Sequence, residues 1–325
     1  MLINFFSINC DFSLFPIDQK SESSLIDNSI VKIVFPIISI LGIALTWTYF
    51  SYKKRKKESE FYQNLRLREV HGNIQNLRKG HMIIPFLDKN KMQNYFDSLK
   101  KFYSRPMPYL EQFNVNSEIE IGYMSLKRKE CFVVRNGEIP IELEDFIPYI
   151  SEVHKIGLGI LLAIEEDLRL KPGELIQTVS KGPLPEHEIS PSLLRLFSYA
   201  PFLEYGVAAE PHQDIGLLTI IPVSEVPALE ILDHSSGYPA WVNIEQLANS
   251  SEAIVLVGKT LNIMTQGQYM TCVHQVQKSS SKRYSIVYQM RADPRAKIQH
   301  GHEIITIGEL MRKLREQTYS INHRK

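Results

Sequence analysis

Two polar residues, His212 and Asp214, stand two positions apart in the segment "EPHQDIGLLTIIP" (210–222), just before a run of aliphatic residues. In an extended strand, side chains at i and i+2 project from the same face, so this imidazole and carboxylate can converge on one point. Such a pair is either an ordinary charged pair at the edge of a strand or two of the three ligands of a metal ion. A third ligand elsewhere in the chain would favour the metal site.

The best candidate for a third ligand is His274 in "TCVHQVQ", 60 residues beyond Asp214 in another β-prone run. Two neutral imidazoles and one carboxylate on one face of an Fe(II) ion leave positions open for O2 and a co-substrate. His212, Asp214 and His274 are therefore predicted to form an iron site.

A second pair, Arg283 and Ser285 in "KRYSIVY", begins nine residues after His274 and again has i, i+2 spacing. An arginine fork beside a hydroxyl is suited to bind a carboxylate with two hydrogen bonds. That carboxylate would belong either to a co-substrate or to the substrate. Each motif is common by chance, but the ordered set inside one β-rich segment is far more specific.

The elements that must position these residues lie in residues 193–318, where short β-prone runs alternate with turns. Strands that follow one another without intervening helices favour an antiparallel sandwich or barrel. Thr306 and Glu309 have the spacing of a capping box, which predicts a last helix. The predicted strands include "LLTIIP", "ALEILD", "AWVNI", "AIVLVGKTL", "YMTCVHQVQ" and "RYSIVYQM".

Residues 80–192 are predicted to form a mainly helical part that precedes the β core. The clearest amphipathic helices fall at 91–103 and 147–170, and Pro172-Gly173 ends the second. No N-terminal strand is evident in this part.

The β-rich segment resembles the C-terminal half of the iron- and 2-oxoglutarate-dependent dioxygenase superfamily, in particular its isopenicillin N synthase-like family. "HQDIGLLTII", "AWVNI", "LVGKTLNIMTQG", "VHQV" and "RYS" follow the order of that family's pattern. "IGYMSLKRKECFVVR" and "TIGELM" extend the likeness to about residues 80–318. The resemblance implies an α+β protein with a double-stranded β-helix (jelly-roll) core flanked by helices.

The resemblance also implies roles for single residues. His212, Asp214 and His274 match the iron ligands, and Arg283 and Ser285 match the residues that hold the distal carboxylate of 2-oxoglutarate. Tyr199 in "LRLFSYAP" matches a second donor to the co-substrate, and the alternative is a tyrosine that only packs within its strand. Three positions that are not predicted ligands depart from the family pattern: Lys259, Gln275 and Phe197. Phe197 stands where the family usually has an asparagine that helps to position the co-substrate, so the resemblance does not specify this part of the pocket.

The function implied is a dioxygenase that uses Fe(II), 2-oxoglutarate and O2, and that hydroxylates a small organic substrate with release of succinate and CO2. Desaturation or ring closure is an alternative outcome. One alternative function is an isopenicillin N synthase-type iron oxidase that does not use 2-oxoglutarate. Another is a non-catalytic binding module on the same fold.

The N-terminal region predicts a membrane anchor at residues 29–52, because Ile33–Phe50 contains 18 residues without a charge. As a helix this stretch would extend about 27 Å, close to the hydrocarbon thickness of a bilayer. The basic run "KKRKK" (53–57) follows at once, which predicts that the rest of the chain faces the cytosol. Residues 1–28 then form a short extracytosolic tail, and residues 53–79 form a charged stalk.

Composition narrows the classes of partner. The 37 basic and 36 acidic residues nearly cancel, so no nucleic-acid partner is expected. The three cysteines are far apart, which excludes a CxxC metal site and favours a reducing compartment. We expect a single-pass membrane protein that acts on a small molecule, and a substrate of apolar character would suit its attachment to a membrane. A cytosolic enzyme whose true start lies after the anchor remains an alternative.

Overall fold

The β-rich half of the chain forms two facing antiparallel sheets. The computed structural model describes residues 74–322, apart from short gaps at 115–118, 127, 180–181, 185–188, 203 and 235–236. The larger sheet has the strand order β1-β9-β6-β11-β4-β3-β2. Its strands are β1 (His81–Pro85), β2 (Gly122–Leu126), β3 (Lys129–Val134), β4 (Leu193–Tyr199), β6 (Leu218–Pro222), β9 (Glu252–Val257) and β11 (Arg283–Met290).

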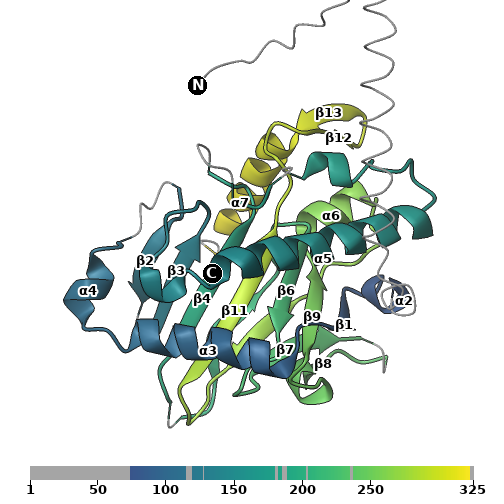
Figure 1. Ribbon diagram of the computed structural model, residues 1–325. Helices are drawn as coiled ribbons and strands as arrows, with labels where there is room; N and C mark the ends of the chain where they lie inside the picture. The colour runs from purple at the N-terminus through teal and green to yellow at the C-terminus, as the bar shows by residue number, and fades with distance from the viewer. Residues whose placement is uncertain are drawn as a thin grey trace, which may run out of the picture. The chain divides into compact units, whose positions relative to one another are not determined.

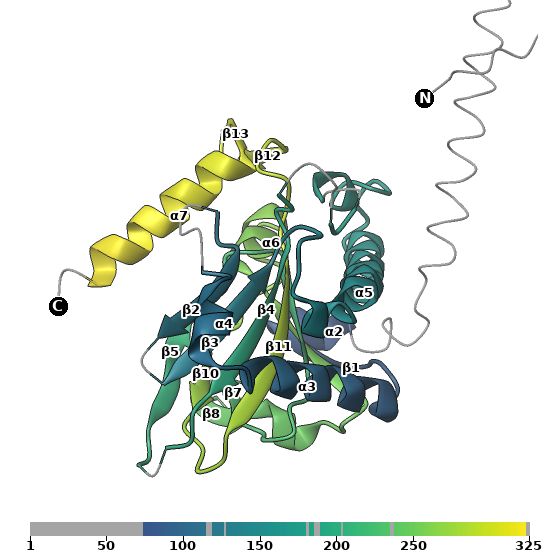
Figure 2. The same cartoon turned by 60° about the vertical axis from the view of Figure 1, so that its left-hand side comes forward.

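The smaller sheet faces the larger one and has the order β5-β10-β7-β8. Apolar residues from both sheets share one core cluster, in which Ile221 and Leu256 of the larger sheet join Leu229, Ile231 and Val276 of the smaller. This packing makes the double-layered β core that the sequence predicted (Figure 2). The strands of the smaller sheet are β5 (Val207–His212), β7 (Leu229–Asp233), β8 (Ala240–Asn243) and β10 (His274–Gln277).

Two helices, α3 (Lys89–Tyr103) and α5 (Phe146–Asp167), lie across the outer face of the larger sheet (Figure 1). Helix α3 begins where the side chain of Asp88 accepts hydrogen bonds from the backbone N–H groups of Asn90 and Lys91. Both helices bury apolar residues at helical spacing against the sheet. Their positions confirm the two helices that the amphipathic patterns predicted.

The remaining elements surround this core. Three of the strands, β1, β2 and β3, fall in the part that was predicted as mainly helical. Their pairing explains them, because β1 pairs with β9 and becomes the edge strand, and the β2–β3 hairpin extends the sheet beyond β4. The other elements are α2 (Ile74–Leu77), α4 (Met107–Glu111), η1 (Ile141–Leu143), η2 (Ile176–Thr178), η3 (Ile244–Leu247), α6 (Lys259–Met264), β12 (Lys297–His300), β13 (Glu303–Thr306) and α7 (Ile307–Asn322).

The end of β9 and the start of α7 show how local sequence decides an element. "GKTL" was predicted to continue β9, but it turns into α6 because Gly258 passes directly against the backbone after Asp214.

Helix α7 has the predicted capping box: the Glu309 carboxylate accepts from the backbone N–H of Thr306 at 2.7 Å, and the Thr306 hydroxyl accepts from the Glu309 N–H at 3.2 Å.

The predicted membrane anchor at 29–52, with the tail before it and residues 53–73 of the stalk, lies outside the described residues. Within residues 74–322, one helical stretch, Ile141–Asp167, is long and apolar enough to cross a membrane. Two-thirds of its apolar window is buried against the rest of the protein, and it contains the core helix α5. Ile74 and Leu77, which were predicted as the end of the stalk, are buried in α2.

Candidate metal centre and carboxylate clamp

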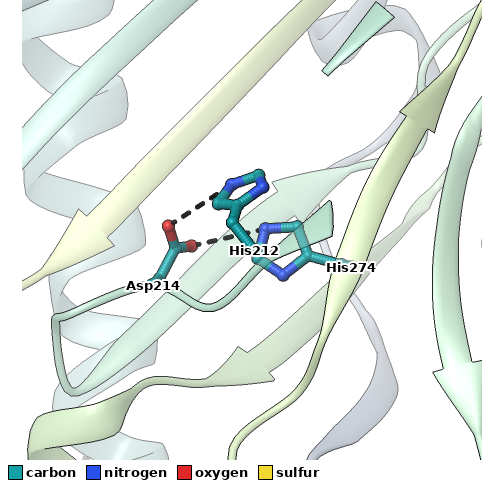
Figure 3. Close-up of side chains that lie close together, drawn as sticks. All are labelled: His212, Asp214 and His274. Atoms are coloured by element: carbon teal, nitrogen blue, oxygen red, sulfur yellow. Dashed lines mark ion pairs between the residues drawn. The ribbon is translucent and has the colours of Figure 1, made fainter. Parts of the chain in front are cut away.

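His212, Asp214 and His274 converge on one point between the two sheets (Figure 3). His212 closes β5, His274 opens β10, and the two residues are directly paired in the register of these strands. Asp214 lies in the loop after β5, with its carboxylate oxygens 4.0 Å from His212 Nε2 and 3.8 Å from His274 Nε2. One ligand atom from each residue lies within 4.8 Å of the others, so the three can share a metal ion.

Backbone carbonyls orient both imidazoles. The Nδ1 atom of His212 is 2.7 Å from the carbonyl oxygen of Glu210, and that of His274 is 3.2 Å from the carbonyl oxygen of Cys272. Because a carbonyl can only accept, each Nδ1 is assigned as the protonated nitrogen, which leaves a lone pair on Nε2. Burial lowers the pKa of His274, although the charge of Asp214 opposes this, so the ring stays neutral and able to bind a metal.

Two side chains hold the carboxylate of Asp214. The Thr219 hydroxyl donates to Oδ2 at 2.5 Å, and the amide of Gln289 donates to Oδ1 at 2.7 Å. Burial alone would raise the pKa of Asp214, but the electrostatic interaction with the nearby His274 ring and the hydrogen bond from Thr219 bring it below its ordinary value. The carboxylate is therefore ionised and oriented before any ion binds.

The backbone around Asp214 is fixed by the end of β9. A Cβ atom on Gly258 would overlap the carbonyl oxygen of Gly216, so only glycine fits there. The next residue, Lys259, donates its backbone N–H to the carbonyl of Asp214 at 2.8 Å. Lys259, which departs from the family pattern, thus supports the loop through its backbone rather than its side chain.

The donor set fits Fe(II). Two imidazoles and one carboxylate whose ligand atoms lie within 4.8 Å of one another are the donor set of the facial site in non-haem iron oxygenases. His274 and Asp214 are buried, whereas nearly half of the His212 side chain is exposed. Access to the centre is therefore open on the side of His212.

Arg283, on β11, points its guanidinium into a buried polar cluster. Nε donates to the carbonyl of Val226 at 3.1 Å, and Nη2 donates to the Ser224 hydroxyl at 3.0 Å and to both carboxylate oxygens of Glu245 at 3.2 Å. The remaining nitrogen, Nη1, is buried and has no hydrogen-bond partner among the described residues. A buried cationic donor without a partner is costly, so it points to an anionic ligand.

Glu245 is the counter-ion of Arg283 and was not predicted from the sequence. Its carboxylate also accepts from the backbone N–H groups of Ser224, Ala228 and Leu229, at 3.0, 2.7 and 2.8 Å. Burial would raise the pKa of Glu245, but Arg283 and these amide donors together lower it. The ion pair is completely buried and holds Arg283 in one orientation.

All six residues singled out in the sequence line one cavity of about 130 Å³. Tyr199 is paired with Arg283 across β4 and β11, and its ring lies 5.4 Å from the guanidinium carbon. Ser285 is paired with Phe197 in the same register. The cavity is lined by Lys129, Arg195, Phe197, Tyr199, Ala209, His212, Asp214, Ile221, Leu229, His274, Val276, Arg283, Ser285, Val287 and Gln289.

Sequence reasoning missed the residues that support the site. Gln289 continues the alternation of Arg283 and Ser285 along β11, so the same period of two could have placed it in the cavity. Thr219 and Glu245 carry no such signal, because their contacts with Asp214 and Arg283 depend on how separate strands come together.

Comparisons with known proteins agree with this geometry. A model of the 2OG-Fe(II) oxygenase superfamily matches residues 190–292, which contain all six candidate residues. The 2-oxoglutarate-dependent dioxygenase ucsF of an Acremonium species is 30% identical over 48% of this chain and 50% of its own length. This chain therefore spans about half the length of ucsF. Protein SRG1 of Arabidopsis thaliana is 24% identical over 82% of this chain and 75% of its own length.

A solved structure shares the fold. A full-length protein of Neurospora crassa in complex with alpha-KG superposes with a TM-score of 0.61 at 15% identity, over 76% of this chain and 90% of that one. The donor set and the family match support the predicted Fe(II), 2-oxoglutarate and O2. Residues 190–292 therefore match the 2OG-Fe(II) oxygenase superfamily, which is the resemblance that the motifs of this segment predicted.

Proposed function

We propose that this protein is an Fe(II)- and 2-oxoglutarate-dependent oxygenase that oxidises a small organic substrate, with hydroxylation as the expected reaction. One observation carries the proposal. A two-histidine, one-carboxylate centre shares a cavity with a buried arginine, and one nitrogen of that arginine has no partner among the described residues. The first group suits a ferrous ion and the second suits the far carboxylate of a dicarboxylic keto acid.

Each residue has a distinct task in this proposal. His212, Asp214 and His274 would hold the metal, while Nη1 of Arg283 and the hydroxyl of Ser285 would hold the distal carboxylate of 2-oxoglutarate. When these are bound with O2, the chemistry supplied is oxidative decarboxylation to succinate and CO2, coupled to oxidation of the substrate.

The protein's own contribution is orientation and exclusion of water. Glu245 fixes Arg283, while Thr219 and Gln289 fix Asp214, so the polar groups need little rearrangement when ligands bind. Apolar side chains from both sheets, such as Ile221 and Val276, also line the cavity and disfavour water there. Tyr199 lies beside Arg283 and is proposed as a second contact for the co-substrate.

Anaerobic titration of the purified full-length protein with Fe(II) and then 2-oxoglutarate tests the proposal. We expect a metal-to-ligand charge-transfer band, followed by succinate when O2 is admitted. His212→Ala should abolish iron binding, whereas Arg283→Gln should keep iron and weaken 2-oxoglutarate binding. A wild-type protein that binds iron but gives neither the band nor succinate would favour an oxidase that uses its substrate carboxylate instead. Absence of iron binding would favour the non-catalytic module.

We also propose that residues 29–52 anchor the protein in a membrane with residues 53–325 on the cytosolic side. The support is the uncharged stretch from Ile33 to Phe50 and the basic run that follows it. Alkaline carbonate extraction should leave the full-length protein in the membrane pellet. Release into the supernatant would contradict the anchor without affecting the proposed chemistry.

A further inference from the structure

The wall of the cavity carries more positive charge than the proposed iron and co-substrate require. Lys129, Arg195 and Arg283 line it, whereas Asp214 is the carboxylate among the described lining residues. Arg283 is already neutralised by its buried contact with Glu245. The two other cations, Lys129 and Arg195, therefore need a separate explanation.

Lys129 opens β3 and is paired with Tyr199, which is itself paired with Arg283 on the next strand. Its ammonium lies 5.4 Å from the ring of Phe197 and 5.9 Å from that of Tyr199. The side chain is half-buried, and no carboxylate of a described residue lies within ion-pairing distance of it. Burial lowers its pKa, and the nearby charge of Arg195 lowers it further.

Arg195 lies four residues before Tyr199 on β4 and is paired with Val287 of β11, nearer to the metal centre. Its guanidinium is 3.5 Å from the carboxylate of Glu120, but Arg291 contacts the same oxygen at 3.3 Å. One carboxylate thus serves two arginines. This leaves the arginine pair with a positive charge that no carboxylate of the described residues balances.

Phe197 lies between Arg195 and Tyr199 on one face of β4, and Tyr199 is the residue paired with Lys129 of β3. It replaces the asparagine that the resemblance led us to expect, so an apolar ring takes the place of a hydrogen-bonding group. Ile221, Leu229 and Val287 continue the apolar wall from the two sheets. The cavity thus offers an apolar surface with a positive charge at either end of Phe197.

Given the proposed function, the formal charges of the site with iron and 2-oxoglutarate bound indicate the charge that the substrate should carry. A ferrous ion with Asp214 carries one positive charge, and doubly negative 2-oxoglutarate converts this to one negative charge. Lys129 and Arg195 add two positive charges, while the Arg283–Glu245 pair adds none. One positive charge remains, and a singly charged anion would cancel it, whereas a doubly charged phosphate would make the site net negative.

We propose that the substrate is a small organic acid whose carboxylate is bound by Lys129 and Arg195 while its apolar body packs on Phe197. Arginine and lysine form charge-assisted hydrogen bonds with carboxylates, and the arginine fork can do so with two bonds. The acid group is thereby held on the larger sheet, and the apolar body extends toward the metal centre. This inference rests on the proposed iron and 2-oxoglutarate chemistry.

The test compares acids with their own primary amides on the full-length protein, loaded with Mn(II) and 2-oxoglutarate under argon. Phenylacetate, cinnamate and octanoate are each titrated beside phenylacetamide, cinnamamide and octanamide by calorimetry. We expect at least one acid to bind about ten-fold or more tightly than its amide, since a hydrogen bond to a charged group contributes more than one to a neutral group. Lys129→Gln and Arg195→Gln should each reduce that preference by about ten-fold.

Controls separate this inference from loss of folding and from the proposed function. Lys101→Gln alters an exposed lysine on α3 outside the cavity and should leave the preference unchanged. The charge-transfer titration with Fe(II) and 2-oxoglutarate is run first on each variant, and it should change by less than about two-fold in Lys129→Gln and Arg195→Gln. Its absence in the wild type would refute the proposed function itself.

With that band present, three results overturn the substrate proposal. They are equal binding of acid and amide, binding of none of the acids, and a loss of 2-oxoglutarate affinity in the variants equal to the loss of acid affinity. The last result would assign Lys129 and Arg195 to the co-substrate.

Discussion

The buried contact between Arg283 and Glu245 predicts that removing Arg283 will have opposite effects in two backgrounds. In the wild type, Arg283→Met breaks the ion pair, but Glu245 keeps three backbone N–H donors, from Ser224, Ala228 and Leu229. Breaking a buried pair costs about 3–5 kcal/mol when the remaining charge is uncompensated. Because these amides compensate Glu245 in part, we expect a loss near the lower end, about 3 kcal/mol.

Glu245→Gln is expected to destabilise the protein more. Arg283 then retains the carbonyl of Val226 and the hydroxyl of Ser224 but no negative charge from the described residues. The new amide group also faces backbone donors that need an acceptor. We expect a loss of about 5 kcal/mol, which lowers the Tm by roughly 10–20 °C for a domain of this size.

In the Glu245→Gln background, Arg283→Met should stabilise the protein, because it removes a buried charge that has lost its counter-ion. The sign of its effect therefore reverses, and the coupling measured by the double-mutant cycle should exceed about 3 kcal/mol. Urea unfolding of the single and double variants, followed by circular dichroism, gives the four free energies.

A matched control is Glu230→Gln on β7. Glu230 accepts hydrogen bonds from Gln275 and Gln277 but has no cation among its contacts with described residues, so its loss should cost about 1 kcal/mol or less. If Arg283→Met destabilises both backgrounds equally, the two residues are not coupled and the account of Glu245 as the counter-ion is wrong. Both Arg283→Met variants should lose the 2-oxoglutarate charge-transfer band while they still bind Fe(II).

Three further predictions concern the support of the site and the last helix. Gln289→Leu removes a hydrogen bond to Asp214 and should weaken Fe(II) binding about 10- to 100-fold in a chelator competition, whereas unchanged affinity would show that the bond does not orient the ligand. Gly258→Ala drives a Cβ into the Gly216 carbonyl and should cost about 1–3 kcal/mol or more in urea unfolding; a neutral effect would refute the close approach. Thr306→Ala removes the cap of α7 and should cost about 1 kcal/mol, while Thr306→Ser should restore most of it.

The proposed metal centre could be predicted from the sequence because its chemistry restricts the residue types. A ferrous ion in an oxygenase needs imidazole and carboxylate ligands, and the spacing of His212 and Asp214 suits an extended segment. Alternation along one strand then linked Arg283 with Ser285, which both line the cavity. The two long helices, α3 and α5, could also be predicted from the sequence, because their apolar residues recur at helical spacing.

The short strands of the N-terminal part could not be predicted in the same way. In β1, "HMIIP" has no alternation of polar and apolar residues strong enough to distinguish it from a loop or a helix end. It becomes a strand because Met82 and Ile84 are buried while the backbone pairs with β9. Strands of this kind form because they pair with segments far away in the sequence, and such pairing cannot be predicted from local β propensity.

The same difference explains why the sequence points to the proposed ligands but not to the residues that contact them. A ligand must be of one chemical type, so its identity is visible in the sequence. A support must only place a donor or an acceptor at one point in space, and an amide, a hydroxyl or a backbone carbonyl can each do this. Gln289, Thr219 and the carbonyls of Glu210 and Cys272 all fill such roles here. The sequence shows that Lys129 and Arg195 are charged, but it does not show that they share a cavity. That depends on the register between β3 and β4. In our proposal, the acid group of the substrate is therefore recognised by residues that long-range strand pairing brings together, and no local motif marks them.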